Sequence, residues 1–156
     1  MTKNNEIEIK LEKIEGCEDL PVPVSASKFS SGVDLFSAEN HELLIKSNEV
    51  KLVSTGIKID IPEGYEGQVR PRSGLAVKHG ITVLNSPGTI DSDYRGTIKV
   101  ILINLGEKAF SIKRGDRIAQ LVIQKIYFPN FNVVQSLNNT KRGEGGFGHS
   151  GIKTLK

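Results

Sequence analysis

The stretch VKLVSTGIKIDI, residues Val50–Ile61, decides the fold class because its apolar residues recur at nearly every second position. A period of two places successive side chains on opposite faces of an extended chain, which is typical of a half-buried β-strand. Valine and isoleucine, the commonest apolar residues of the stretch, also favour strands. The stretch therefore predicts strand structure near the middle of the chain.

Further segments show the same alternation or short β-branched runs. They are Ile7–Leu11, Gly67–Arg72, Gly80–Asn85, Gly96–Leu105 and Arg117–Ile126. Short segments rich in Gly, Pro, Asn and Asp separate them, and these residues are typical of turns. Only the segment after Ser73 is expected to start a short helix. We therefore predict an all-β protein, either a sandwich or a jelly-roll-like β-barrel.

Length and composition restrict the function classes. A chain of 156 residues is the size of one ordinary domain. Its 21 Lys and Arg against 18 Asp and Glu give a net charge of +3 without a long basic run, so nucleic-acid binding is not indicated. The single Cys17 and three scattered histidines lack the spacing of zinc ligands. No apolar run suits a signal core or a membrane span, and we expect a cytoplasmic protein without a membrane partner.

The C-terminal stretch RGEGGFGHSG, Arg142–Gly151, contains five glycines, one arginine and one phenylalanine. Gly143, Gly145 and Gly148 have the G-x-G-x-x-G spacing of dinucleotide-binding sites. That interpretation fails, because too few residues follow for the helix and second strand of the βαβ unit. The glycines must serve another purpose.

The chain changes character from Tyr127 onward. It contains one plausible short strand, Phe131–Val134, and is otherwise polar and rich in glycine. We predict a core of residues 1–128 and an arm of residues 129–156. Such an arm gains little by folding on itself, so we expect it to dock on a neighbouring subunit.

The stretch PRSGLAVKHG, Pro71–Gly80, places Ser73 directly after a predicted strand. Two interpretations stay open. Ser73 either caps the N-terminus of the short helix, or its hydroxyl, the free N–H groups of the first turn and the Arg72 guanidinium converge on an anion such as phosphate.

The stretch NSPGTIDSDYRGTIKV, Asn85–Val100, predicts a hairpin whose second arm is the strand from Gly96. Asp91 is either an ordinary turn residue or a strand-end carboxylate that acts as a general base in a pocket beneath the hairpin. Tyr94 is either a core or cross-strand aromatic or a flat face for a sugar or a base.

Two polar residues in other predicted strands have similar alternatives. Asp34, at a strand start beside Gly32, is adequately explained as a capping residue. Gln120 lies in an otherwise apolar strand, where its amide either satisfies a neighbouring backbone group or donates to a ligand. Taken alone, its position favours the backbone partner.

Together these stretches resemble the five ordered motifs of the trimeric deoxyuridine triphosphate pyrophosphatases, the dUTPases. The matching stretches are SGVDL (Ser31–Leu35), RPRSGLA (Arg70–Ala76), GTIDSDYRG (Gly88–Gly96), RIAQL (Arg117–Leu121) and RGEGGFGHSG (Arg142–Gly151). The resemblance implies a jelly-roll-like β-barrel subunit in a homotrimer. It also implies active sites at subunit interfaces, with an exchanged C-terminal arm closing over a neighbour's site.

The resemblance further implies hydrolysis of dUTP to dUMP and pyrophosphate by Mg²⁺-assisted attack of water on the α-phosphate. This reaction would limit uracil incorporation into DNA and supply dUMP for dTMP synthesis. Asp91 matches the carboxylate that activates the water. Asp34 matches an acid that supports the metal through water, while the substrate phosphates mainly hold Mg²⁺.

The substrate-binding residues follow from the same resemblance. The phosphate chain would be held by Arg72, Ser73, Gly74 and Gln120. The uracil and deoxyribose would contact Asn85, Gly88, Thr89, Ile90, Tyr94, Thr97 and Lys99. In the arm, Phe147 would lie over the uracil ring while Arg142, Gly146 and Gly148 bind the outer phosphates. Either His149 or Ser150 would contact the γ-phosphate.

Two rival functions use the same stretches. A dCTP deaminase shares the fold, but the IDSDYRG hairpin and the complete glycine-rich motif argue against it. A dUTP-dependent binding protein would use the site as a sensor whose arm controls a protein partner. No inserted segment supports this second role, which would be an addition to hydrolysis.

Overall fold

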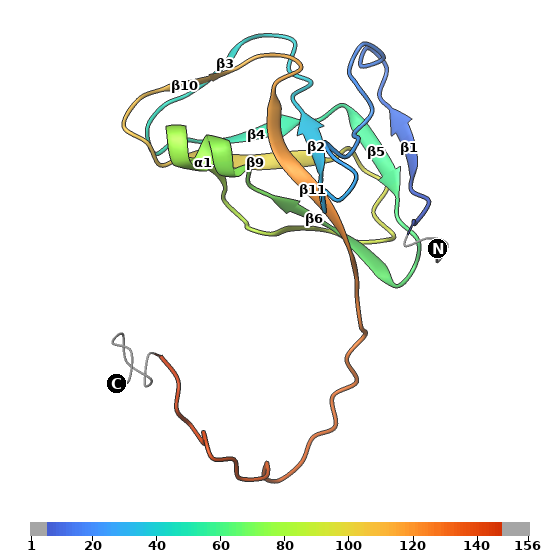
Figure 1. Cartoon of the computed structure of the whole chain (residues 1–156), viewed down its shortest axis with the longest axis vertical. Helices are drawn as coiled ribbons and strands as arrows, with labels where there is room; N and C mark the ends of the chain where they lie inside the picture. Colours follow the sequence, from blue (N-terminus) through green and yellow to red (C-terminus); the bar gives the residue numbers. More distant parts are fainter. Residues whose placement is uncertain (1–5, 148–156) are drawn as a thin grey trace.

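The computed structural model describes residues 6–147 as a β-rich body followed by an extended C-terminal segment (Figure 1). The elements are β1 (Lys10–Lys13), β2 (Val33–Phe36), β3 (Leu43–Ile45), β4 (Val50–Ser54), β5 (Ile57–Asp60), β6 (Tyr65–Arg70), α1 (Ser73–His79), β7 (Ile81–Val83), β8 (Gly88–Ile90), β9 (Lys99–Asn104), β10 (Phe110–Ile112) and β11 (Arg117–Lys125). This order confirms the predicted β fold and the short helix after a strand. In the part of the chain that the structure describes, no helix has the length and apolar character needed to cross a membrane.

Two larger sheets enclose the core. One has the strand order β2-β11-β6-β8 and the other β4-β9-β7, and the pairs β1-β5 and β10-β3 extend the body. Inward side chains of both sheets belong to one apolar cluster, among them Leu35 and Leu121 from the first sheet and Val53 and Leu102 from the second. The alternation of each strand thus sends one face into the core.

The predicted strand run Val50–Ile61 is divided at a corner between β4 and β5. The amide and the hydroxyl of Thr55 both donate to the Ile98 carbonyl, at 3.1 and 2.7 Å. Gly56 has a left-handed φ of +70°, and a Cβ there would lie 2.6 Å from the Cys17 sulfur. The chain therefore changes sheets at a position where glycine alone fits. The strands β3 and β10, each three residues long, were not predicted.

The predicted hairpin of Asn85–Val100 is wrong in its pairing. β8 pairs with β6, whereas β9 pairs with β4 and β7. The segment between β8 and β9 crosses from one sheet to the other, and the Ile98 amide is bound by the Ile57 carbonyl at 2.9 Å. Each strand satisfies its backbone groups with neighbours distant in sequence, so adjacency along the chain did not decide the pairing.

The segment after β11 leaves the body. The Ile126 amide donates to the Gly64 carbonyl at 2.9 Å, and the described chain beyond it runs outward without a helix or strand (Figure 1). The predicted strand Phe131–Val134 is therefore wrong for the single chain, because no neighbouring strand lies beside it there. Phe131 and Val133 are 86% and 94% exposed. The division into a core of residues 1–128 and an arm of residues 129–156 stays a prediction.

Asn104 is a fully buried polar residue that joins three chain segments. Its Nδ2 donates to the carbonyls of Ile45 and Lys108 at 2.9 and 2.8 Å, and its Oδ1 accepts from the Gly106 amide at 2.9 Å. Its relative exposure is 0%. Because a buried amide is costly unless bonded, these three partners make Asn104 a determinant of the β9–β10 end of the body.

We expect Asn104→Ala to lower the free energy of unfolding by about 3 kcal/mol, since two carbonyls and one amide lose their partner and a cavity forms. Urea unfolding followed by circular dichroism would measure the change. Lys108→Ala is the matched control, because only the Lys108 carbonyl takes part in the network. Equal stability of the two variants would contradict the assigned role.

Arg114 ties the N-terminal loop to the body. Its Nε and Nη2 donate to both oxygens of Asp19, at 2.9 and 2.7 Å, and its Nη1 donates to the Ala38 carbonyl at 2.8 Å. The hydrogen bond from Arg114 holds the pKa of Asp19 below its ordinary value of 3.8. The bidentate pair therefore favours the ionised carboxylate.

A lowered folded pKa stabilises the protein above the ordinary pKa of the group, and this stabilisation is lost as the pH falls through the folded pKa. We expect Asp19→Asn to lower the melting temperature at neutral pH, and the gap from the parent protein to close below about pH 4. Thermal unfolding across this range is the measurement. Glu15→Gln serves as control, because Glu15 makes no ion pair with any residue between 6 and 147. A gap that persists in acid would refute the linkage.

Candidate functional site

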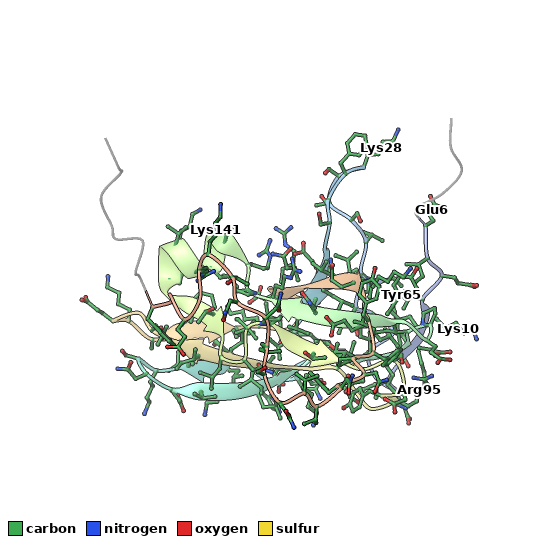
Figure 2. The ribbon with its side chains drawn as sticks, turned by 90° about the horizontal axis from the view of Figure 1, so that it is seen from below. Glu6, Lys10, Lys28, Tyr65, Arg95 and Lys141 are labelled. Atoms are coloured by element: carbon green, nitrogen blue, oxygen red, sulfur yellow. The ribbon has the colours of Figure 1, made fainter. Side chains whose placement is uncertain are left out.

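A first cavity, of about 430 Å³, gathers the predicted phosphate-binding residues. Its walls are formed by Ala26, Ser30, Ser31, Gly32, Asp34, Arg72, Ser73, Gly74, Arg117 and Gln120. The loop containing Lys28 stands out from the body in Figure 2 and supplies Ala26, Ser30 and Ser31 to the wall of this cavity. Segments from β2, the β6–α1 junction and β11 thus converge, although they are far apart in the sequence.

Asp34 is held between two arginines in this cavity. Its Oδ1 accepts from Arg72 Nε at 3.0 Å and its Oδ2 accepts from Arg117 Nη1 at 3.2 Å. The Asp34 side chain is 19% exposed. Two guanidinium groups against one carboxylate leave a positive cavity, which suits a polyanion.

Arg117 is a candidate ligand that the sequence reasoning missed. It opens the stretch RIAQL, in which only Gln120 was assigned a role. The available signal was a charged residue at the first position of a motif that is apolar apart from Gln120. Its side chain is 54% exposed, so its remaining donors can reach a bound anion.

Ser73 is not the cap of the short helix. Arg72 is the N-cap residue, and its carbonyl accepts from the amides of Leu75 and Ala76 at 3.1 and 3.0 Å. Ser73 is the first helical residue, and the structure shows no side-chain bond at the cap. The capping interpretation is therefore wrong. A Cβ on Gly74 would meet no atom within 4 Å, so packing inside the chain does not require glycine there.

The side-chain amide nitrogen of Gln120 has a hydrogen-bond partner within the chain. Its Nε2 donates to the Pro71 carbonyl at 3.0 Å, which confirms the preferred interpretation of a backbone partner. A Cβ on Gly32 would lie 2.7 Å from Gln120 Oε1. Gly32 thus allows the loop to approach Gln120 closely. This close approach is a role beyond that of a turn residue beside Asp34.

A second cavity, of about 320 Å³, gathers most of the predicted nucleoside-binding residues. Its walls are formed by Leu52, Thr89, Ile90, Asp91, Tyr94, Thr97, Ile98 and Lys99. Asp91 is exposed at the end of β8. The strand-end carboxylate therefore faces a cavity, as its functional interpretation requires.

Tyr94 rests on a glycine that the sequence reasoning did not single out. A Cβ on Gly96 would lie 2.5 Å from Tyr94 Cζ, so the ring needs glycine beneath it. The Tyr94 hydroxyl donates to the Thr97 carbonyl at 3.1 Å. The ring is 47% exposed, so it is no core aromatic and presents a face at the cavity.

Asn85 and Gly88 lie outside the walls of this cavity. Asn85 Nδ2 is 3.2 Å from the position of a Cβ on Gly88. Gly88 opens β8 and pairs with Val69, whereas Asp91 follows the other end of the strand. The structure therefore separates Asn85 from Asp91 by the length of β8.

The two cavities share no residue and lie toward opposite ends of β6. Ile90 is opposite Gly67 and Gly88 is opposite Val69, so Asp91 is level with Glu66. Arg72 lies six residues further along the chain, a separation of roughly 20 Å at about 3.3 Å per residue. In one chain, Asp91 and Arg72 cannot contact the same phosphate group.

The C-terminal segment, as far as it is described to Phe147, lines neither cavity in the single chain. Arg142 Nε donates to the Gly145 carbonyl at 2.7 Å, next to Gly146. Phe147 is fully exposed and has a left-handed φ of 50°. Gly148, His149 and Ser150 lie outside the described residues.

The carboxylates that line the two cavities are groups that could take part in holding a metal ion. Among residues 6–147, no cluster of three His, Cys, Asp or Glu side chains could hold a cation alone. Asp34 and Asp91 are single carboxylates in separate cavities. Such donors suit Mg²⁺, which keeps several waters and binds through few protein groups and substrate phosphates.

Comparisons with known proteins agree with these features. The dUTPase family profile matches residues 18–151. Deoxyuridine 5'-triphosphate nucleotidohydrolase of Thermoanaerobacter sp. (strain X514) is 51% identical over 144 residues, covering 92% of this chain and 97% of that protein. The protein of that name from Ehrlichia canis (strain Jake) is 52% identical over 154 residues, covering 97% and 100%. The solved dUTPase of Staphylococcus bacteriophage 80alpha with dUPNHPP has a TM-score of 0.84 at 27% identity, covering 93% of this chain and 99% of that chain.

We expect Arg117→Ala to weaken binding of inorganic triphosphate about threefold to tenfold at low salt and less at high salt, because an exposed charge contact is lost and salt screens it. Titration calorimetry on the intact protein would measure this. Lys113→Ala is the control, since Lys113 is an exposed cation outside the cavity. Equal affinity of the two variants would remove Arg117 from the site.

Proposed function

The chain belongs to the dUTPase family, and we propose that it hydrolyses dUTP to dUMP and pyrophosphate in the cytoplasm, limiting uracil incorporation into DNA and supplying dUMP for dTMP synthesis. The observation that carries the proposal is the gathering of Asp91 and Tyr94 around one cavity and of Arg72 and Ser73 around another. Relatives that are 51% and 52% identical in sequence bear the name deoxyuridine 5'-triphosphate nucleotidohydrolase. The phage neighbour binds dUPNHPP, an analogue of dUTP.

Asp91 is the proposed general base. Its exposed carboxylate accepts a proton from a water molecule that attacks the α-phosphorus in line with the pyrophosphate leaving group. Arg72, Ser73 and Gly74 bind the phosphate chain, with Gln120 supporting the Pro71–Arg72 backbone. The open space above Gly74 lets an anion approach the first turn of α1.

Mg²⁺, when bound to the substrate phosphates, would offset the charge that shifts onto pyrophosphate. Asp34 is the residue proposed to support it through water. Both Asp34 oxygens already bind arginine, but a carboxylate has further lone pairs for a water molecule. Asp34 thus joins the arginines to the hydrated phosphates.

Base and sugar selection is assigned to the second cavity. Among residues 6–147, β8 pairs on one side only, so half of the backbone groups of Thr89 and Ile90 have no strand partner there and can bond uracil. Thr97 and Lys99 line the same cavity. Asn85 is proposed to contact uracil from the Gly88 end. The Tyr94 ring packs against deoxyribose where a 2′-hydroxyl would collide.

A homotrimer would bring together two half-sites, the Asp91 cavity of one subunit and the Arg72 cavity of another. Because Asp91 and Arg72 lie roughly 20 Å apart in one chain, a complete site needs a second copy. The outer face of the β4-β9-β7 sheet offers a surface for it: Val50, Leu52 and Leu84 are 43%, 56% and 53% exposed. Leu52 also lines the Asp91 cavity, so a copy on this face would lie beside the general base.

An apolar cavity on the body is the proposed docking site for the exchanged arm. A cavity of about 440 Å³ is walled by side chains of β1, β2, β5 and β11, including Leu11, Val33 and Ile59. The exposed Phe131 and Val133 of a neighbour would bury apolar surface there. The following residues would then carry Arg142, Gly146, Phe147 and Gly148 over the substrate, as a lid.

The first test is pyrophosphate release from dUTP, dCTP, dTTP and UTP with Mg²⁺, using the intact protein and a chain ending at Thr140. We expect turnover of dUTP alone, and its loss in the folded truncated protein because the lid is missing. Ammonia release from dCTP would instead support a deaminase. Equal activity of both chains would remove the arm from the site.

A second test concerns the shared site. Asp91→Asn and Ser73→Ala should each be inactive. When the two variants are mixed and exchange subunits, we expect roughly a quarter of the parent activity to return. One interface in four then joins an intact Asp91 of one subunit to an intact Ser73 of another. Sedimentation would follow the assembly. A mixture of Asp91→Asn with Asp91→Ala is the control. No recovery despite mixed assembly would show that each site lies within one chain.

A further inference from the structure

The turn that carries Asp91 and Tyr94 has few backbone hydrogen bonds. Between residues 91 and 97, the one backbone bond runs from the Tyr94 amide to the Asp91 carbonyl, at 3.1 Å. β8 ends at Ile90, and the next anchored amide is that of Ile98. The position of the turn relative to the barrel therefore depends on side chains.

Arg95 supplies these bonds from within the turn. Its Nη1 donates to the carbonyls of Ser92 and Tyr94 at 2.6 and 3.0 Å. Its Nη2 donates to Oδ1 of Asp60, the last residue of β5, at 2.5 Å. One guanidinium therefore connects two carbonyls of the turn to a strand of the body.

The guanidinium acts from outside the Asp91 cavity. Arg95 lines a separate surface hollow with Lys10, Lys58 and Asp60, and Figure 2 shows Arg95 and Lys10 at the same end of the body. It is absent from the walls of both site cavities. Arg95 is thus in place to hold the turn without touching a substrate in either cavity.

These contacts determine geometry more than stability. The Arg95 and Asp60 side chains are 56% and 38% exposed, and exposed ion pairs contribute little to stability. A planar guanidinium with fixed donors nevertheless orients three acceptors at once, which a lysine ammonium does not reproduce. The Tyr94 carbonyl that it holds belongs to the residue whose ring rests on Gly96 at the cavity.

We propose that Arg95, seated by Asp60, is a positioning residue that holds the β8–β9 turn so that Asp91 and Tyr94 face the cavity. The inference rests on the proposed dUTP hydrolysis. A displaced general base loses its alignment with the attacked phosphorus, which lowers the rate of the chemical step more than the binding of substrate. A displaced Tyr94 loses its contact with the sugar.

The test compares Arg95→Ala, Arg95→Lys and Asp60→Asn with Glu12→Gln. Glu12 forms an ion pair with Lys58 at 2.9 Å across the same two strands, β1 and β5, and has no link to the turn. The readouts are kcat and KM for dUTP and UTP, amide hydrogen exchange of residues 91–98, and the melting temperature.

In Arg95→Ala we expect kcat for dUTP to fall about tenfold with KM within about twofold, and the preference for dUTP over UTP to shrink. Exchange in residues 91–98 should accelerate while the melting temperature stays near that of Glu12→Gln. Arg95→Lys should restore little, and Asp60→Asn should show a smaller loss. Glu12→Gln should match the parent.

Equal kcat and equal exchange in Arg95→Ala and Glu12→Gln would overturn the inference while the proposed function stands. A loss of kcat without faster exchange would also overturn it, because Arg95 would then act on the substrate. If the parent protein leaves dUTP untouched, the proposed function fails. Unchanged exchange in Arg95→Ala would even then disprove the positioning of the turn.

Discussion

The hydrogen-bond ladder between β6 and β8 is the constraint from which the arrangement of both half-sites follows. It sets Gly88 opposite Val69 and Ile90 opposite Gly67. A slip by one residue would turn the buried Ile90 out of the core, so the register is strongly specified. Asp91 and Arg72 therefore leave the sheet at opposite ends of the ladder, and rotamer changes cannot bring them together. The second copy proposed for the site would be a consequence of this one pairing.

The same sheet arranges the charges of the phosphate side. Asp34 on β2 and Arg70 on β6 both lie opposite Gln120 on β11, which brings the β6–α1 junction close to the Asp34 carboxylate. Arg72 and Arg117 then reach Asp34 from two directions. Arginines already ordered by a carboxylate lose less conformational freedom when an anion binds. The carboxylate thus makes the positive cavity more rigid at the cost of part of its charge.

At one glycine and at several apolar residues, the single chain leaves space or apolar surface uncovered. Gly74 has open space above it, and Phe131, Val133 and Phe147 face solvent. Apolar side chains in such number on one extended segment are unfavourable in water unless another surface covers them. The proposed substrate and neighbouring copy would give both features a physical reason.

The sequence by itself determined the β class, a short helix near Ser73 and many of the residues that line the two cavities, because period-two alternation and the motif stretches are local properties of the chain. Only the tertiary structure decided that β8 pairs with β6, that Arg117 shares Asp34 with Arg72, and that Tyr94 rests on Gly96. Alternation states that a side chain is buried but not which distant strand covers it. The roles of Arg95 and Asp60, 35 positions apart, arise from such a long-range contact and have no local pattern.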